Sequence, residues 1–328
     1  MAAKKKTTTS GPGQTAYSQG AFLDLPEEAS SYDRAKVVIL PLPYEESVSY
    51  GAGTARGPAA IIEASQQVEL YDPESNSEIA MIYGIHTLSV PPIFTIREKP
   101  AAQAVIDAIA AETARHASAG KRVVGLGGEH TVSLGVARGL AEAWGDFTLV
   151  HIDAHADLRD SYEDNPLSHA CVVRRIAELP QCEAVLQFGI RSTSPEQVAF
   201  VHEHRSKTGN RPLIKAWPAE EMHQSNKWRK ELAKKVEGKS VFLTFDVDGL
   251  DPAIIPATGT PEPNGLTWPQ LMDIGRIAAK HSAFFCGMDC VELSPRENLH
   301  HADFTTARAL YKLIGFFMEA AAEKEAKP

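Results

Sequence analysis

The sequence is poor in cysteine and in aromatic residues. Four cysteines occur in 328 residues, and aromatic side chains make up only 7%. So few cysteines, with no apolar leader before them, are typical of a reducing cytoplasm and argue against a disulfide-stabilised secreted protein. Cys286 and Cys290 have the spacing of a metal knuckle, but no second pair exists. We therefore expect all four, Cys171, Cys182, Cys286 and Cys290, to have no functional role.

Long apolar runs and an excess of positive charge are also missing. No stretch approaches the ~18 apolar residues that a membrane helix requires, so we expect no membrane span and no membrane partner. The formal net charge is −9. A nucleic-acid-binding surface normally carries a basic stripe, so this charge argues against nucleic acid as a partner. A small cationic substrate is compatible with the negative electrostatic potential that this net charge creates.

The remaining composition predicts one large folded unit. A hydrophobic content of 43% is sufficient for a substantial core. Residues 1–31 are rich in Thr, Ser, Gly and Lys and are expected to form a flexible N-terminal tail, while residues 32–328 form a single domain.

Within that domain, apolar strand patterns alternate with helical patterns. Strands are predicted at 36–42, 122–126, 147–152, 184–190, 240–245 and 284–293, and helices at 58–65, 101–119, 131–144, 169–179, 195–205, 227–236, 268–280 and 305–322. Residues 72–100 look irregular. This alternation predicts a single-domain α/β fold with a mostly parallel β-sheet and helices on both faces.

Acidic residues and histidines follow several of these strands. Asp153, His155 and Asp157 alternate in H-I-D-A-H-A-D, and Asp246 and Asp248 alternate in F-D-V-D-G. Alternate residues of an extended chain point the same way, so each group converges. A third apolar run is followed by His130 in G-G-E-H, where Glu129 is either a partner of the site or a loop acid. Each motif alone could be a turn or a helix cap, but their combination indicates a site.

The electrostatics of these motifs favour metal ions. Four carboxylates in one pocket would repel each other unless a cation neutralised them, and two divalent ions would balance four negative charges. Oxygen-rich coordination with about one imidazole per ion favours Mn²⁺ over Zn²⁺.

These motifs carry a family resemblance that extends from about residue 37 to residue 321. Together with P-Y-E-E-S-V-S-Y-G-A-G-T-A-R-G-P-A-A-I and C-V-E-L-S-P, the blocks G-G-E-H, D-A-H-A-D and D-V-D-G-L-D-P resemble the ureohydrolases of the arginase and agmatinase superfamily. The similarity to agmatinases is strongest, through L-R-D-S-Y-E-D-N-P-L-S-H-A and A-T-G-T-P-E-P-N-G-L-T. The resemblance implies an arginase-like three-layer α/β/α fold. It also implies a hydrolase that cleaves a C–N bond of a linear amidine and releases urea and an amine.

The resemblance also implies a role for each site residue. Two Mn²⁺ ions per subunit would be held by His130, Asp153, Asp157 and Asp246 and by Asp153, His155, Asp246 and Asp248, so that Asp153 and Asp246 bridge. A hydroxide bridging the ions would attack the guanidinium carbon. Glu292 would pair with the guanidinium, and His169 would relay a proton to the departing amine. Membership would further imply a homo-oligomer, a trimer or a hexamer, and the cysteine usage already described predicts a cytoplasmic protein.

Two features of the loop after Asp157 bear on the substrate. Residues that hold an amino-acid head group in arginases are absent, and Glu163 and Asp164 suit the far amine of agmatine or aminopropylagmatine. The products would then be urea and putrescine or spermidine, a step of polyamine biosynthesis. Arg159 would instead suit a guanidino acid such as 4-guanidinobutyrate. The motifs are also compatible with a zinc amide hydrolase or with a non-catalytic homologue, although no ligand of the six is missing.

Overall fold

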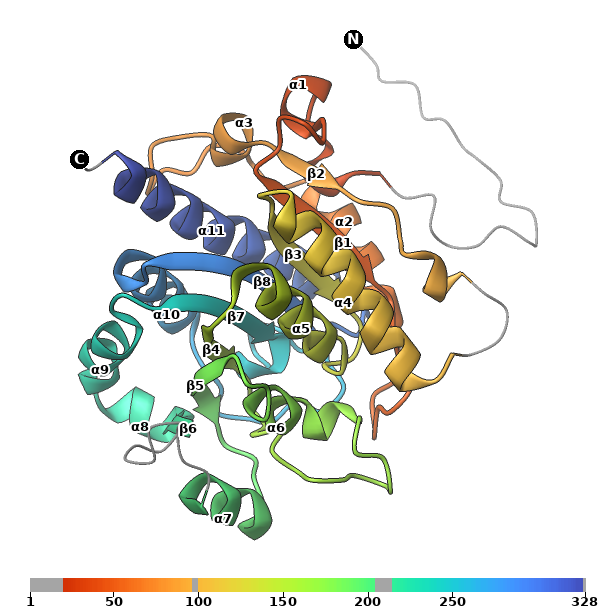
Figure 1. Ribbon diagram of the computed structural model, residues 1–328, viewed down its shortest axis with the longest axis vertical. Coiled ribbons are helices and arrows are strands. Elements are labelled where there is room, and N and C mark those ends of the chain that lie inside the picture. The colour runs from red at the N-terminus through yellow and green to blue at the C-terminus, as the bar shows by residue number, and fades with distance from the viewer. Residues whose placement is uncertain (1–19, 96–99, 204–213, 327–328) are drawn as a thin grey trace.

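A single parallel sheet forms the centre of the molecule. The computed structural model describes residues 20–95, 100–203 and 214–326. Within these residues, eight strands pair in the order β2-β1-β3-β8-β7-β4-β5-β6, and every pairing is parallel (Figure 1). Their bounds are β1 Val37–Leu42, β2 Ile85–Thr87, β3 Arg122–Gly127, β4 Phe147–Ile152, β5 Cys182–Ile190, β6 Ile214–Pro218, β7 Ser240–Asp246 and β8 Phe284–Val291.

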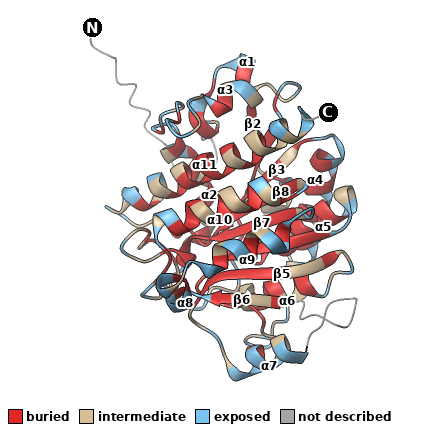
Figure 2. Ribbon diagram, turned by 90° about the vertical axis from the view of Figure 1, so that its left-hand side faces the viewer, coloured by how far each residue is buried: buried red, intermediate tan, exposed pale blue. Residues whose placement is uncertain are grey.

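Helices cover both faces of the sheet, as Figures 1 and 2 show. The bounds are α1 Glu27–Ser30, α2 Gly57–Ser65, α3 Ile79–Tyr83, α4 Ala102–Ser118, α5 Val132–Trp144, α6 Val172–Ala177, α7 Pro195–Glu203, α8 Ala219–Gln224, α9 Lys227–Val236, α10 Trp268–His281 and α11 His300–Glu325. Helices α2, α9, α10 and α11 pack into one apolar cluster, and α4, α5 and α6 into the other. The predicted α/β class with helices on both faces is therefore confirmed.

Strand β1 shows how the sequence produces this layering, because its residues are apolar and buried at every position. Val37 and Ile39 of β1 belong to one cluster, while Val38 and Leu40 belong to the other. Successive side chains of a strand point to opposite faces, so a continuously apolar strand is buried on both sides. Figure 2 shows the sheet buried between helices whose outer sides are exposed.

Several elements and boundaries differ from the prediction. Residues 72–100 were expected to be irregular, yet they contain α3 and the edge strand β2, and the edge strand β6 and helix α8 were also not predicted. Strand β8 ends at Val291, because Glu292 adopts a positive φ of 65° that no extended strand can accommodate. The predicted helix at 195–205 is α7 as far as Glu203, and its last two residues lie outside the described residues.

Part of the expected N-terminal tail packs against the domain. Phe22 and Ala29 are fully buried, and the backbone N–H of Leu23 donates to the Ser65 hydroxyl at 2.8 Å. The apolar side chains at 22, 23 and 25 belong to the same buried cluster as those of α2, so residues 20–31 are part of the fold. Residues 1–19 lie outside the described residues.

The cysteines take no part in a metal knuckle. All four are free and buried, and Cys286 and Cys290 of β8 belong to different apolar clusters, on opposite sides of the sheet. Among the described helices, none has the length and the apolar content that crossing a membrane would require.

Candidate functional site

The candidate site lies at the carboxyl ends of four neighbouring strands in the middle of the sheet. In space these are β3, β8, β7 and β4. His130 comes shortly after β3, Asp153 follows β4, Asp246 ends β7, and Glu292 follows β8. Because all strands are parallel, these four ends open at the same edge of the sheet, which is where α/β sheets build their sites.

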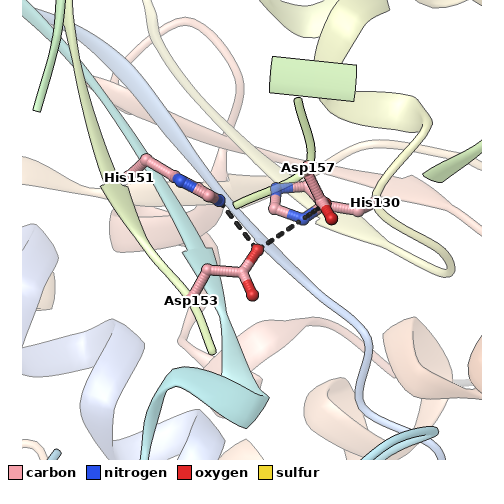
Figure 3. A group of neighbouring side chains, drawn as sticks. All are labelled: His130, His151, Asp153 and Asp157. Carbon is pink, nitrogen blue, oxygen red and sulfur yellow. Dashed lines mark hydrogen bonds and ion pairs between the residues drawn. The ribbon is translucent and has the colours of Figure 1, made fainter. Parts of the chain in front are cut away.

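One group of side chains surrounds the imidazole of His130. Its Nδ1 atom lies 3.2 Å from Asp153 Oδ2, 3.2 Å from Asp157 Oδ2 and 3.3 Å from Asp246 Oδ2. Figure 3 shows His130, Asp153 and Asp157 pointing toward one another, with His151 on the other side of Asp153. All are almost completely buried. One ring nitrogen thus faces three carboxylates, as expected at a cation site.

The hydrogen bonding of His130 tests whether this group fits a metal ion. Its Nε2 atom contacts the Thr244 hydroxyl at 3.0 Å, whereas its Nδ1 atom is buried and has no hydrogen-bond partner of acceptable geometry. A buried polar atom without a partner is costly in an ordinary core. A cation between Nδ1 and the three carboxylates would resolve this, so the residues fit a metal ion.

A second group shares Asp153 with the first. His155 Nδ1 lies 3.0 Å from Asp248 Oδ2 and 3.5 Å from Asp153 Oδ1. The nitrogen and oxygen atoms of Asp153, His155 and Asp248 are close enough to hold an ion, as are those of His130, His151, Asp153 and Asp157. Asp153 is common to both groups, which is the arrangement of a binuclear metal site.

The negative charge of the site is strong enough to perturb its own residues. Burial, together with Asp248 and Asp153, raises the pKa of Asp246 well above its usual value. Burial would lower the pKa of His155, but the carboxylates of Asp248 and Asp153 raise it to about 12. Both shifts have the same cause, a concentration of buried negative charge that a bound cation would offset.

Glu292 forms part of the pocket wall next to these groups. It is 8% exposed, and its Oε1 atom accepts the backbone N–H of His130 at 2.6 Å. Burial and the nearby Glu129 raise its pKa well above the usual value. Both Glu292 and Asp157 have positive φ angles, of 65° and 52°. Non-glycine residues in this region cost ~1–3 kcal/mol and are concentrated at functional sites.

His169 is held by two residues that the sequence did not assign to the site. Its Nδ1 atom contacts the Ser47 hydroxyl at 3.0 Å, and that hydroxyl donates to Glu129 Oε1 at 2.8 Å. Because the single hydroxyl hydrogen is used for Glu129, Nδ1 of His169 must be the donor. Nε2 is then the nitrogen that His169 offers to the pocket. Glu129 is fully buried and is a partner of the site rather than a loop acid.

The pocket between these residues has a volume of about 280 Å³. Its lining includes His155, Asp157, His169, Asp246, Asp248 and Glu292 of the predicted site, together with Tyr50, Arg159, Tyr162 and Glu262. His130 and Asp153 lie below it, fully or almost fully buried. The structure therefore brings all eight predicted residues together.

The acidic residues expected at the entrance do not line the pocket. Glu163 and Asp164 are exposed and absent from the lining, whereas Glu262 is half-buried and part of it. Arg159 also lines the pocket, with its guanidinium 5.3 Å from the ring centre of Tyr162. Glu163 and Glu262 both fall between predicted elements, and only the folded chain distinguishes them.

Comparison with known proteins identifies relatives over nearly the whole chain. The sequence model described as "Arginase family" matches residues 35–318. The chain is 36% identical over 319 residues to the N(1)-aminopropylagmatine ureohydrolase of Synechocystis sp., covering 96% of this chain and 97% of that protein. It is 35% identical to the agmatinase of Bacillus anthracis, covering 90% of this chain and 94% of that protein.

Solved structures show the same architecture. The agmatine ureohydrolase of Thermoplasma volcanium superposes with a TM-score of 0.76 at 26% sequence identity, covering 95% of this chain and 98% of that one. The similarity therefore includes the sheet, its covering helices and the strand ends at which the candidate site lies.

Proposed function

The chain belongs to the arginase family, and from this premise we propose that it is a manganese ureohydrolase of agmatine or aminopropylagmatine. The products are urea and putrescine or spermidine. One observation carries the proposal. Two ion-binding groups share Asp153 beneath a pocket that also presents Glu292 and His169, the residue types needed to hold a guanidinium and to protonate an amine.

The proposed ligands are the two sets expected from the resemblance. One ion would be held by His130, Asp153, Asp157 and Asp246, and the other by Asp153, His155, Asp246 and Asp248. Divalent cations bound there would lower the pKa of water at the site, so that hydroxide would be available near neutral pH. We further propose a cytoplasmic homo-oligomer, a trimer or a hexamer. The four free, buried cysteines are in keeping with a reducing compartment.

The chain's own residues orient the substrate and move the proton. Glu292 is fixed through Oε1 by the His130 backbone N–H, which leaves Oε2 to accept from the planar guanidinium. Addition of hydroxide at the guanidinium carbon is followed by cleavage of the bond to the alkyl nitrogen. With Nδ1 donating to Ser47, His169 has a second proton on Nε2 only as an imidazolium, and in that form it donates the Nε2 proton to the alkyl nitrogen, so that a neutral amine leaves.

Glu262 supports an amine at the far end of the substrate. It is the half-buried acid of the pocket lining, and no hydrogen bond or ion pair of its carboxylate is found among the described residues. The names of the Synechocystis and Bacillus relatives agree with a terminal amine. Arg159 favours a second candidate, a guanidino acid such as 4-guanidinobutyrate, because it places a cation in the same lining.

A substrate panel separates the two candidates. Urea release from agmatine, aminopropylagmatine, arginine, 4-guanidinobutyrate, 3-guanidinopropionate and guanidine is measured with Mn²⁺ present, and kcat/KM is compared. We expect the two amines to rank first. Glu262→Gln is expected to lower kcat/KM for them about fivefold, equivalent to ~1 kcal/mol for a half-exposed ion pair. Glu163→Gln is the matched control and leaves it unchanged. If the wild type prefers a guanidino acid and Arg159→Met reduces that preference, the amine assignment is overturned.

A further inference from the structure

His151 is a fully buried histidine that contacts the shared ligand Asp153. It lies on β4 two residues before Asp153, and its Nε2 atom is 2.7 Å from Asp153 Oδ2 (Figure 3). Its position is compatible with two roles, an additional metal ligand or a support for a ligand. We propose that His151 is a positioning residue that orients Asp153, and that Gln187 holds it in that role. The inference rests on the ligand set proposed above.

Strand pairing places Gln187 beside His151. The two residues are register partners on β4 and β5, 36 positions apart in the sequence, and Gln187 is 1% exposed. The Gln187 amide nitrogen lies 2.8 Å from the carbonyl oxygen of Ala156 and 3.0 Å from His151 Nδ1. A carbonyl oxygen only accepts hydrogen bonds, so the amide must turn its nitrogen to this side.

The orientation of this amide determines the tautomer of His151. The Gln187 nitrogen has two hydrogens, and with one donated to Ala156 the other is donated to Nδ1 of His151. Nδ1 is then an acceptor without a proton, and the ring proton is on Nε2. A protonated Nε2 has no lone pair for a metal ion. It can only donate to Asp153 Oδ2, in a charge-assisted hydrogen bond.

Both oxygens of Asp153 are thereby fixed by donors. Oδ2 accepts from His151, and Oδ1 accepts the backbone N–H of His155 at 2.6 Å. A carboxylate held at both oxygens cannot rotate, and each oxygen keeps a lone pair for an ion. A ligand shared by two metal positions gains most from such support, because its rotation would misplace both ions.

The first test measures the Mn²⁺ affinity of the metal-free protein by competition with a fluorescent chelator. Gln187→Leu removes both amide donors at similar volume, and Gln187→Glu replaces them with acceptors. We expect either change to weaken Mn²⁺ binding about 10- to 100-fold. Thr148→Val, a nearly isosteric buried change in β4, the strand of His151, is the control and leaves affinity unchanged. Unaltered affinity in folded Gln187 variants would overturn the proposal.

A second measurement identifies the coordinated imidazoles directly. Electron-nuclear double resonance of the Mn²⁺-loaded protein detects ¹⁴N nuclei bonded to manganese. His151→Gln keeps an N–H donor near Asp153, and we expect its ¹⁴N couplings to match those of the wild type. Loss of one coupling would show that His151 is a ligand. Neither test uses a substrate, so a protein that binds manganese as expected but releases no urea would refute the proposed function and leave this inference standing.

Discussion

The hydrogen bonds that link His169 to Ser47 and Ser47 to Glu129 allow the orientation of His169 to be tested separately from folding. The Ser47 hydroxyl donates to Glu129 Oε1 at 2.8 Å and accepts from His169 Nδ1 at 3.0 Å. Thr131 donates its hydroxyl to the same Glu129 oxygen at 2.6 Å. Ser47→Ala removes a hydrogen bond donated to Glu129 and also the hydroxyl that holds the His169 ring. Thr131→Val removes a hydrogen bond to Glu129 and a 3.3 Å contact with the carbonyl oxygen of Leu167, but no contact with the His169 ring, so it is the matched control.

The expected magnitudes follow from these contacts. A hydrogen bond to a charged group contributes ~1.5–3 kcal/mol, so both variants lose stability in that range. The His169 contact in Ser47→Ala is worth ~1 kcal/mol when it orients the ring in the transition state, and kcat falls about fivefold. Thr131→Val leaves kcat near the wild-type value. His169→Ala removes the proton donor itself, and kcat falls by ~10²–10⁴.

The assay combines three measurements on each variant. Thermal unfolding gives stability, elemental analysis after Mn²⁺ loading gives metal content, and urea release gives kcat and KM. We expect Mn²⁺ content to stay at the wild-type level throughout, because none of the three residues is a proposed ligand. An equal fall of kcat in Thr131→Val and Ser47→Ala would refute the orientation argument. Unchanged turnover in His169→Ala would remove that residue from the reaction, and lost manganese would move it into the ligand set.

Two further predictions concern the metal site and a buried ion pair. Each chain is expected to bind two Mn²⁺, with Asp248→Ala impairing one position and Asp246→Ala impairing both; one ion or none in a fully active protein would contradict this. Lys312 Nζ lies 2.8 Å from the buried carboxylate of Asp72. Burial would raise the pKa of Asp72, but Lys312 outweighs it and holds this pKa below the usual value of 3.8. Lys312→Met is therefore expected to cost ~3–5 kcal/mol near pH 7, because it strands a buried charge. This cost shrinks below about pH 4, where Asp72 becomes protonated. The prediction is contradicted when the unfolding midpoint of the variant lies below that of the wild type by the same amount at pH 3 and at pH 7.

The sequence by itself determined the class of the fold and the local convergence of the ligands. Val37 to Leu40 are apolar at every position, which requires burial on both faces and hence a sheet covered on both sides. Asp153 and His155 alternate directly after a strand, so their side chains meet whatever lies around them. These are properties of a chain segment a few residues long, and periodicity decides them.

Tertiary structure decided which segments meet. Only strand pairing brings β3, β8, β7 and β4 side by side and sets Gln187 next to His151. Only folding places Ser47 against His169, 122 residues away, and turns Glu262 rather than Glu163 into the pocket. Edge strands β2 and β6 are short, and their pairing with β1 and β5 defines them more than their own pattern does. The physical reason is that hydrogen-bond partners, tautomers and pocket walls depend on contacts between distant segments, and a local pattern carries no information about its partner.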